Sequence, residues 1–205
     1  MWLLDVGNTN IKTYHDDCIT VQKADANAML PKEPFYYVCV NHAYHDRLKE
    51  NTFAIDLAPF IDLKTQYQGL GADRMMVCKA IEHGVIVDAG SAITVDVMQK
   101  GIHQGGFITL GLQSFEKSFA TISKALNFKI DEKIDLDHLP QNTQDALNFA
   151  TFQAVVGAIE KVRGDLPLYF CGGDAEKLLP FFKDASYHDS LIFKGMKRVI
   201  KESGC

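Results

Sequence analysis

The hydrophobic and polar positions of the chain alternate in a way that is typical of strands in two similar stretches. An apolar run from Trp2 meets an aspartate, then a glycine and small polar residues, and alternation resumes in NIKTY. The stretch VIVDAGSAITVDV from Val85 has the same form, so each predicts strand, tight turn and strand. An internal repeat is indicated, because one constant offset relates Asp5, Gly7 and Asn8 to Asp88, Gly90 and Ser91.

Further strands and helices alternate along the rest of the chain. Strands are predicted at 35–40, 52–57, 105–112 and 167–173, and helices from Ala72 to Gly84, at 113–126, at 143–162 and through Leu178 and Leu179. One face of the 113–126 helix carries the apolar residues Phe115, Phe119, Ile122 and Leu126, which we interpret as core. The closing segment, SLIFKGMKRVI, predicts a strand, a turn and a helix. The interleaving predicts an α/β protein, in which duplicated lobes face each other across a cleft with one turn on each wall.

Composition narrows the class of protein. Of the 205 residues, 47% are hydrophobic and 23% are charged, as in an ordinary globular protein, and no apolar run approaches a membrane span. No signal peptide is predicted, and the five cysteines are dispersed without a CxxC pair, so we expect reduced thiols and a cytoplasmic location. The net charge is −5 and no basic stripe is present, so nucleic acid and membrane are not expected partners.

The two glycine turns have the chemistry of phosphate sites. Gly7 and Gly90 have no Cβ and can adopt backbone angles that other residues avoid. The polar residues after them offer N–H and hydroxyl donors to phosphate oxygens, and Lys12 could neutralise phosphate charge. Asp5 and Asp88 stand where strands end and could hold Mg²⁺ or its waters. An ordinary hairpin turn is the alternative for either turn alone, and the matched pair argues against it.

The segment GLGADR, from Gly69 to Arg74, places an aspartate and an arginine in the first turn of a predicted helix. Asp73 could accept the proton of a substrate hydroxyl, and Arg74 could pair with a carboxylate or a phosphate. The alternative is that Asp73 only caps the helix and Arg74 is a solvated surface residue.

Other segments are less specific. FCGGDA, from Phe170, could accept a nucleotide base or ribose or be a plain strand-to-helix turn, and QGGFITLGL could line the pocket or be structural. His42, His45 and Asp46 are better explained as a solvated face than as a metal site. Neither a P-loop nor GxSxG is present, and a GxGxxG after the first strand is absent too.

The motifs together resemble a known family. DVGNTNIK, GLGADR, DAGSAITVD, GGFITLGL, NTQDAL and CGGDA occur in an order that is similar to type III pantothenate kinase, of the acetate/sugar kinase, Hsp70 and actin superfamily. The resemblance runs from Trp2 to about Val199 and implies two RNase H-like lobes with mixed sheets flanked by helices, ATP between them, and a homodimer. We expect an N-terminal lobe at 1–70 and a C-terminal lobe at 71–205.

The resemblance also implies roles for individual residues. ATP and its phosphates would be bound by Asp5, Val6, Gly7, Asn8, Thr9, Asn10, Ile11, Lys12 and Ser91. Asp73 would be the catalytic base, and pantothenate would be bound by Tyr67, Gly71, Ala72, Asp73, Arg74 and Thr143. Asp5 would hold Mg²⁺, and Asp88 a monovalent cation, K⁺ or NH₄⁺. Ser91 stands where the family has Thr, Cys171 replaces a Thr before the paired glycines, and the loop from Tyr67 is shorter than in the family.

The implied activity is ATP-dependent phosphorylation of pantothenate to 4′-phosphopantothenate, the first step of coenzyme A biosynthesis. Two alternatives stay open: another small-molecule kinase of the superfamily, and a non-catalytic nucleotide-binding regulator. The presence of both Asp73 and Asp88 favours an enzyme, because a pure binding module needs no base.

Overall fold

The computed structural model describes all 205 residues, which form two compact units. The first unit consists of Met1–Glu82, Lys100–His103 and Ser190–Cys205, and the second of His83–Gln99 and Gln104–Asp189. The expected division after residue 70 differs from this one, because the helix that follows residue 71 and the C-terminal helix both belong to the first unit. None of the helices is long and apolar enough to cross a membrane.

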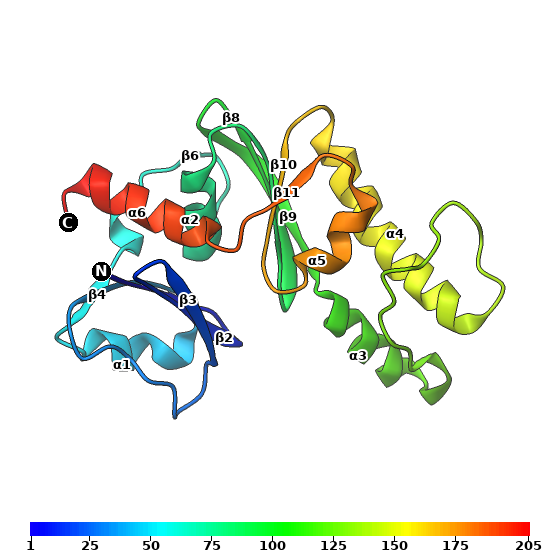
Figure 1. The fold of residues 1–205 in the computed structure, drawn as a ribbon, viewed down its shortest axis with the longest axis horizontal. Helices are drawn as coiled ribbons and strands as arrows, with labels where there is room; N and C mark the ends of the chain where they lie inside the picture. The colour runs from blue at the N-terminus through cyan, green and yellow to red at the C-terminus, as the bar shows by residue number, and fades with distance from the viewer. The chain divides into compact units, whose positions relative to one another are not determined.

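The first unit is built on a five-stranded sheet in the order β3-β2-β1-β4-β5 (Figure 1). Its strands are β1 (Trp2–Val6), β2 (Asn10–His15), β3 (Cys18–Lys23), β4 (Phe35–Cys39) and β5 (Ala54–Asp56). β1 and β2 are antiparallel, as are β2 and β3, whereas β4 is parallel to β1 and to β5. The helices of this unit are α1 (His45–Lys49), α2 (Ala72–Ala80) and α6 (Leu191–Ser203), with short 3₁₀ turns η1 (His42–Tyr44) and η2 (Ala58–Phe60).

The two faces of this sheet are covered by different helices. Leu4 and Val6 of β1 point to one face, where they pack with Leu48 of α1 in a buried cluster. The other face carries Leu3, and Tyr14 lies opposite it on β2. Tyr14 contacts Phe193 of α6, so α6 covers this second face, and α2 packs beside α6 (Figure 1).

The second unit has a sheet in the order β11-β10-β7-β8-β9. Its strands are β7 (Gly84–Ala89), β8 (Ala92–Gln99), β9 (Ile102–Leu110), β10 (Leu168–Cys171) and β11 (Ala185–Tyr187). Its helices are α3 (Leu112–Ile122), α4 (Thr143–Arg163) and α5 (Ala175–Leu178), with 3₁₀ turns η3 (Lys124–Leu126) and η4 (Leu179–Phe181). The first two residues of β9 count with the first unit, where they pair with β6 (Lys64–Thr65). The core of the second unit joins Val87 and Phe170 of the sheet to Phe152 of α4.

The two sheets share one topology, which confirms the internal repeat. β1 and β7 occupy the same place, each antiparallel to the next strand in sequence and parallel to the fourth strand of its unit. Reading outward, the order β3-β2-β1-β4-β5 corresponds to β9-β8-β7-β10-β11. The α/β class with two lobes of mixed sheets flanked by helices is therefore confirmed.

Some local predictions were wrong. The segment at 190–200 contains no strand, because Leu191–Ser203 is one continuous helix, and a short apolar run such as LIF fits a buried helix as well as a strand. α2 ends at Ala80, and Gly84 begins β7. Ile122, expected in the core, is 70% exposed at the end of α3.

Candidate functional site

The turn between β1 and β2 presents charged and polar groups at the end of a buried strand. It is closed by the Gly7 N–H, which donates to the Asn10 carbonyl at 3.0 Å. Asp5 and Lys12 are cross-strand partners, so their side chains are neighbours on the sheet face that α6 covers. Asn8 and Thr9 are exposed at the tip of the turn.

Two of the residues expected at the nucleotide cannot reach it with their side chains. Val6 and Ile11 are cross-strand partners, and both are fully buried in the core on the α1 side. Any contact they make with a phosphate would therefore come from the main chain.

Asn41 holds this turn in place, and the sequence analysis missed it. Its side chain is 8% exposed; Nδ2 donates to the Gly7 carbonyl at 3.1 Å, and the side-chain oxygen accepts the Ala43 N–H at 3.0 Å. The available signal was an asparagine directly after the strand at 35–40, where it caps the following 3₁₀ turn.

The neighbourhood of Asp5 also perturbs two groups on β4. Burial raises the pKa of the Cys39 thiol, and the charges of Asp56 and Asp5 act in the same direction. Burial and the Asp56 charge raise the pKa of Tyr37 to about 12. Cys39 and Tyr37 are thus neutral at physiological pH.

The glycines of the two turns matter for reasons other than those expected. Neither Gly7 nor Gly90 has a positive φ. A Cβ on Gly7 would lie 3.1 Å from the Asn10 carbonyl oxygen, which is a tight contact, and one on Gly90 would make an ordinary contact at 3.7 Å. Close approach of the backbone, not unusual dihedral angles, is what favours glycine at position 7.

The start of α2 brings together most of the residues expected at pantothenate. Gly71 precedes the helix in an extended conformation, and Ala72 is its first residue. The Asp73 side chain is half-buried, and one carboxylate oxygen accepts the Arg74 N–H at 2.7 Å. This bond holds the carboxylate in the first turn of α2, but it is not an N-cap bond, because the N-cap residue is Gly71 and no side chain caps the helix.

Arg74 is not the solvated residue of the alternative reading. Its side chain is only 5% exposed, which is rare for an arginine. Nη1 donates to the Tyr67 hydroxyl at 3.3 Å, and the guanidinium lies 4.9 Å from the centre of the Tyr67 ring. Tyr67, which the resemblance placed at pantothenate although its loop is shorter than the family's, is thus in direct contact with Arg74.

The second turn lies between β7 and β8 and has its own supports. The Gly90 N–H donates to the Ala92 carbonyl at 3.0 Å, and Ser91 is exposed at the tip. Asp88 lies beside Cys171 of β10, and the next residue, Gly172, has a φ of 91°. A Cβ at position 172 would come within 2.5 Å of the Asp88 carboxylate and would overlap the Ala89 carbonyl oxygen, so only glycine fits.

The N-terminus of α3 meets the same turn. Gly111 precedes the helix, its N–H donates to the Ser91 carbonyl at 3.2 Å, and the Ser114 hydroxyl donates to that carbonyl at 2.9 Å. A Cβ on Gly111 would overlap the Gly90 carbonyl oxygen. The GGFITLGL segment is thus a strand followed by a close glycine contact that joins α3 to the turn.

Thr143 is the first residue of α4, after the N-cap Asn142, and its side chain is exposed. It belongs to the second unit, whereas Tyr67 and Gly71–Arg74 belong to the first.

Comparison with known proteins identifies the group to which this chain belongs. A family model described as type III pantothenate kinase matches residues 40–164. A type III pantothenate kinase from Helicobacter hepaticus is 41% identical over 98% of this chain and 99% of its own length. The chain belongs to the type III pantothenate kinase family. The same name is carried by a protein of Wolinella succinogenes, 43% identical over 98% of this chain and 97% of its own.

Solved structures agree with the fold. A crystal structure from Campylobacter jejuni, described as a Baf family transcriptional activator, is 38% identical, covers 100% of this chain and 99% of its own, and superposes with a TM-score of 0.92. A protein of Sinorhizobium meliloti described as a 2-dehydro-3-deoxygalactonokinase has a TM-score of 0.60 at 9% identity, over 98% of this chain and 96% of its own. The latter likeness shows a shared fold.

Proposed function

We propose that this protein transfers the γ-phosphoryl group of ATP to the primary hydroxyl of pantothenate, giving 4′-phosphopantothenate at the entry to coenzyme A biosynthesis. Membership of the type III pantothenate kinase family supports the reaction. The structural observation that carries the proposal is the start of α2, where a carboxylate fixed at the helix N-terminus precedes a buried arginine stacked on Tyr67. A base next to a rigid cation is the arrangement that positions an alcohol for attack on a phosphoryl group.

In the proposed reaction, Asp73 accepts the proton of the primary hydroxyl as its oxygen bonds to the γ-phosphorus. The bond from that phosphorus to the β,γ-bridging oxygen breaks, and ADP leaves. Arg74 donates hydrogen bonds to oxygens at the reacting end of pantothenate, and its stacking on Tyr67 restricts its orientation. Lys12 and the exposed turn at Asn8 and Thr9 supply positive charge and donors for the phosphates. Ser91 supplies a hydroxyl from the second turn.

The oxygen donors fit the two cations that the family implies. Asp5 is a half-buried carboxylate at the end of β1, the kind of ligand through which Mg²⁺ binds alongside substrate phosphates. At Asp88, the carboxylate and the Ala89 carbonyl oxygen both border the place where Gly172 lacks a Cβ, and oxygen ligands of this kind would suit K⁺ or NH₄⁺. When bound, the cations would neutralise phosphate charge. We also propose that Thr143 contributes to pantothenate binding and that the protein forms a homodimer.

The decisive variant is Asp73→Asn, which keeps the shape of the side chain and removes the base. We expect ATP to bind with unchanged affinity while pantothenate-dependent ADP release falls by about 10²–10⁴-fold, the usual contribution of general base catalysis. Turnover is measured by coupled ADP release, and ATP binding by calorimetry. Near-normal turnover in the variant would remove Asp73 from its role.

A second candidate is a nucleotide-dependent regulator, because a close structural relative is described as a transcriptional activator. A net charge of −5 disfavours direct binding to DNA, whose phosphates attract basic surfaces. A lack of pantothenate-stimulated ADP release, in the presence of ATP, Mg²⁺ and K⁺, would favour the regulator. Stimulation by a sugar or another hydroxy acid in place of pantothenate would favour a different small-molecule kinase.

A further inference from the structure

The C-terminal helix α6 contacts two parts of the first unit through opposite faces. Phe193 and Lys197 are one turn apart and both contact Tyr14 of β2: the rings of Phe193 and Tyr14 are 5.4 Å apart, and the Lys197 ammonium donates to the Tyr14 hydroxyl at 2.5 Å. Gly195 lies midway between them in sequence, about 160–200° around the helix, and therefore points away from the sheet. That opposite face packs on α2.

The contact at Gly195 is a close approach of two backbones. A Cβ at this position would overlap the Met76 carbonyl oxygen, would lie 2.8 Å from the Met76 carbonyl carbon, and would lie 3.3 Å from Met76 Cγ. The nearest atoms belong to the main chain, which cannot rotate out of the way as a side chain can. Glycine is otherwise unfavourable inside a helix, so its presence here has a packing reason.

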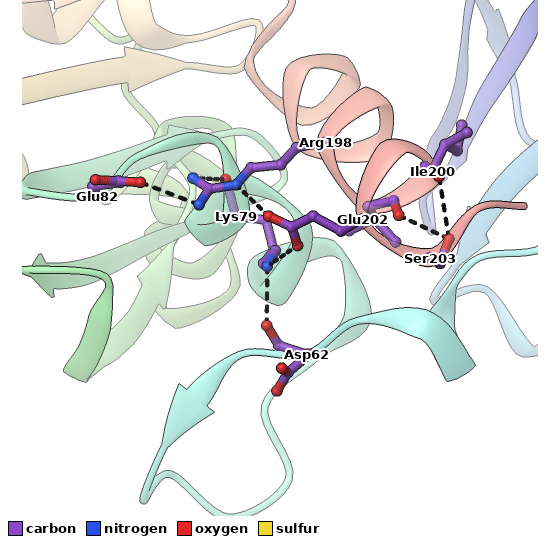
Figure 2. A network of polar contacts seen from close by, with 8 residues as sticks. Asp62, Lys79, Glu82, Arg198, Ile200, Glu202 and Ser203 are labelled. Carbon is purple, nitrogen blue, oxygen red and sulfur yellow. Dashed lines mark hydrogen bonds and ion pairs between the residues drawn. The ribbon is translucent and has the colours of Figure 1, made fainter.

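Polar contacts fix the far end of the same helix pair (Figure 2). Arg198 donates to the Lys79 carbonyl at 3.2 Å and to Glu82 at 3.1 Å, and Lys79 donates to Glu202 at 2.5 Å and to the Asp62 carbonyl at 3.1 Å. Pairs as exposed as Arg198 and Glu82 add little stability. Their geometry nevertheless holds the C-terminal end of α2 against α6.

We propose that Gly195 is a positioning residue for phosphoryl transfer, because the distance it permits between α6 and α2 sets where Asp73 and Arg74 lie relative to Asp5 and Lys12. The inference rests on the proposed function. Asp73 and Arg74 are on the first turn of α2, one turn before Met76. Asp5 and Lys12 are on the sheet face that α6 covers, two residues along their strands from Leu3 and Tyr14. α2 also contacts β4 of the same sheet, so α2 and α6 lie side by side, and their separation at Gly195 sets the distance between the two groups.

An added methyl group at position 195 forces α2 and α6 apart at Met76. Phe193 is 1% exposed and packs against the sheet with Tyr14, so movement of α6 toward the sheet is blocked by a packed core. α2 is held at its C-terminal end by the contacts of Lys79, so its N-terminal turn takes up the displacement.

The test is a pair of glycine-to-alanine variants in helices of the same protein. Gly195→Ala introduces the overlap with Met76, whereas Gly157→Ala, in α4, adds a methyl whose nearest neighbour is the end of the Gln153 side chain at 3.9 Å. Both changes favour helix formation equally. Coupled ADP release is measured with pantothenate varied at saturating ATP, and then with ATP varied at saturating pantothenate.

For Gly195→Ala we expect kcat/KM for pantothenate to fall on the order of 10²-fold, as for a displacement of about 1 Å, with the KM for ATP within twofold. Gly157→Ala stays within twofold of wild type throughout. An unchanged kcat/KM for pantothenate in Gly195→Ala, or a KM for ATP that rises by more than twofold, overturns the inference. If the wild type itself releases no ADP with pantothenate, the proposed function fails and the inference with it; an active wild type with an unaffected Gly195→Ala removes the inference alone.

A measurement on the wild type covers the case in which Gly195→Ala does not fold. Because α2 and α6 are in contact at Gly195, pantothenate bound at the start of α2 slows amide hydrogen exchange in α6 at 193–199 as well as in α2. The C-terminal half of α4, at 156–163, serves as the reference segment and stays unchanged. Protection of α2 without protection of α6 overturns the inference.

Discussion

Tyr67 contacts Arg74 in two ways, and the structure predicts that the ring matters more than the hydroxyl. The hydrogen bond from Arg74 to the Tyr67 hydroxyl is 3.3 Å long, just beyond the usual range. Its loss in Tyr67→Phe therefore costs at the low end of hydrogen-bond energies, about 0.5 kcal/mol. Because about 1.4 kcal/mol corresponds to a tenfold change in affinity, we expect the KM for pantothenate to rise roughly twofold.

The ring has a larger effect because the cation above it is shielded from water. The guanidinium lies 4.9 Å from the ring centre, and Arg74 is 5% exposed. A cation–π contact in such a desolvated place is worth about 2 kcal/mol. Tyr67→Leu keeps apolar bulk but removes the π face, so we expect a rise of roughly 30-fold in the KM for pantothenate.

The assay is coupled ADP release with pantothenate varied at saturating ATP. Thermal unfolding of each variant serves as the control, since a general loss of stability would affect both substrates. Equal effects of Tyr67→Phe and Tyr67→Leu would refute the assignment of the larger part to the ring. A rise in the KM for ATP alone would refute the placement of Tyr67 and Arg74 at pantothenate.

Two further predictions concern backbone and ionisation. Gly172→Ala forces a side chain into a φ of 91° and against Asp88, so we expect it to lower the free energy of unfolding in urea by at least about 2 kcal/mol and to abolish activation by K⁺. Gly173→Ala, with no atom within 4 Å of its added Cβ, is the matched control, and an equal loss in both variants would contradict the steric argument. Burial raises the pKa of Tyr37 from its ordinary 10 to about 12, so the folded state holds this proton more tightly than the unfolded chain does. The resulting stabilisation is present below pH 10 and is lost as the pH rises from 10 to 12. Tyr37→Phe should therefore show a shallower fall in urea midpoint over that interval, and an identical fall would argue that Tyr37 ionises freely.

The repeated strand-turn-strand units were predictable because strand periodicity and turn chemistry are local. One constant offset between Asp5 and Asp88 was enough to indicate two similar sheets, and the strand orders confirm them. The start of α2 was predictable for the same reason, since Gly71 and Asp73 are ordinary signals of a helix N-terminus.

The contacts across the sequence were not predictable, because they depend on tertiary packing. Arg74 was as consistent with a solvated surface as with the buried position it has, and only the fold brings Tyr67 over it. Gly195 in the sequence predicts a break in a helix, yet it lies inside one. A glycine is needed there because the backbone of α2 passes so close. Asn41 carries no charge or motif that marks it, and its role depends on a turn 34 residues away in the chain.

Because α6 belongs to the first unit although it ends the chain, the order of synthesis on the ribosome affects how that unit folds. The sheet, α1 and α2 of that unit leave the ribosome first, but the helix that covers one face of the sheet is made after roughly a hundred further residues, or about 5–20 s later at ordinary translation rates. During that interval Leu3 and Tyr14 lack their cover, and a nascent chain stalled before Ser190 would display an open apolar surface to chaperones and proteases. The half of the protein that is synthesised first is therefore the half that is finished last.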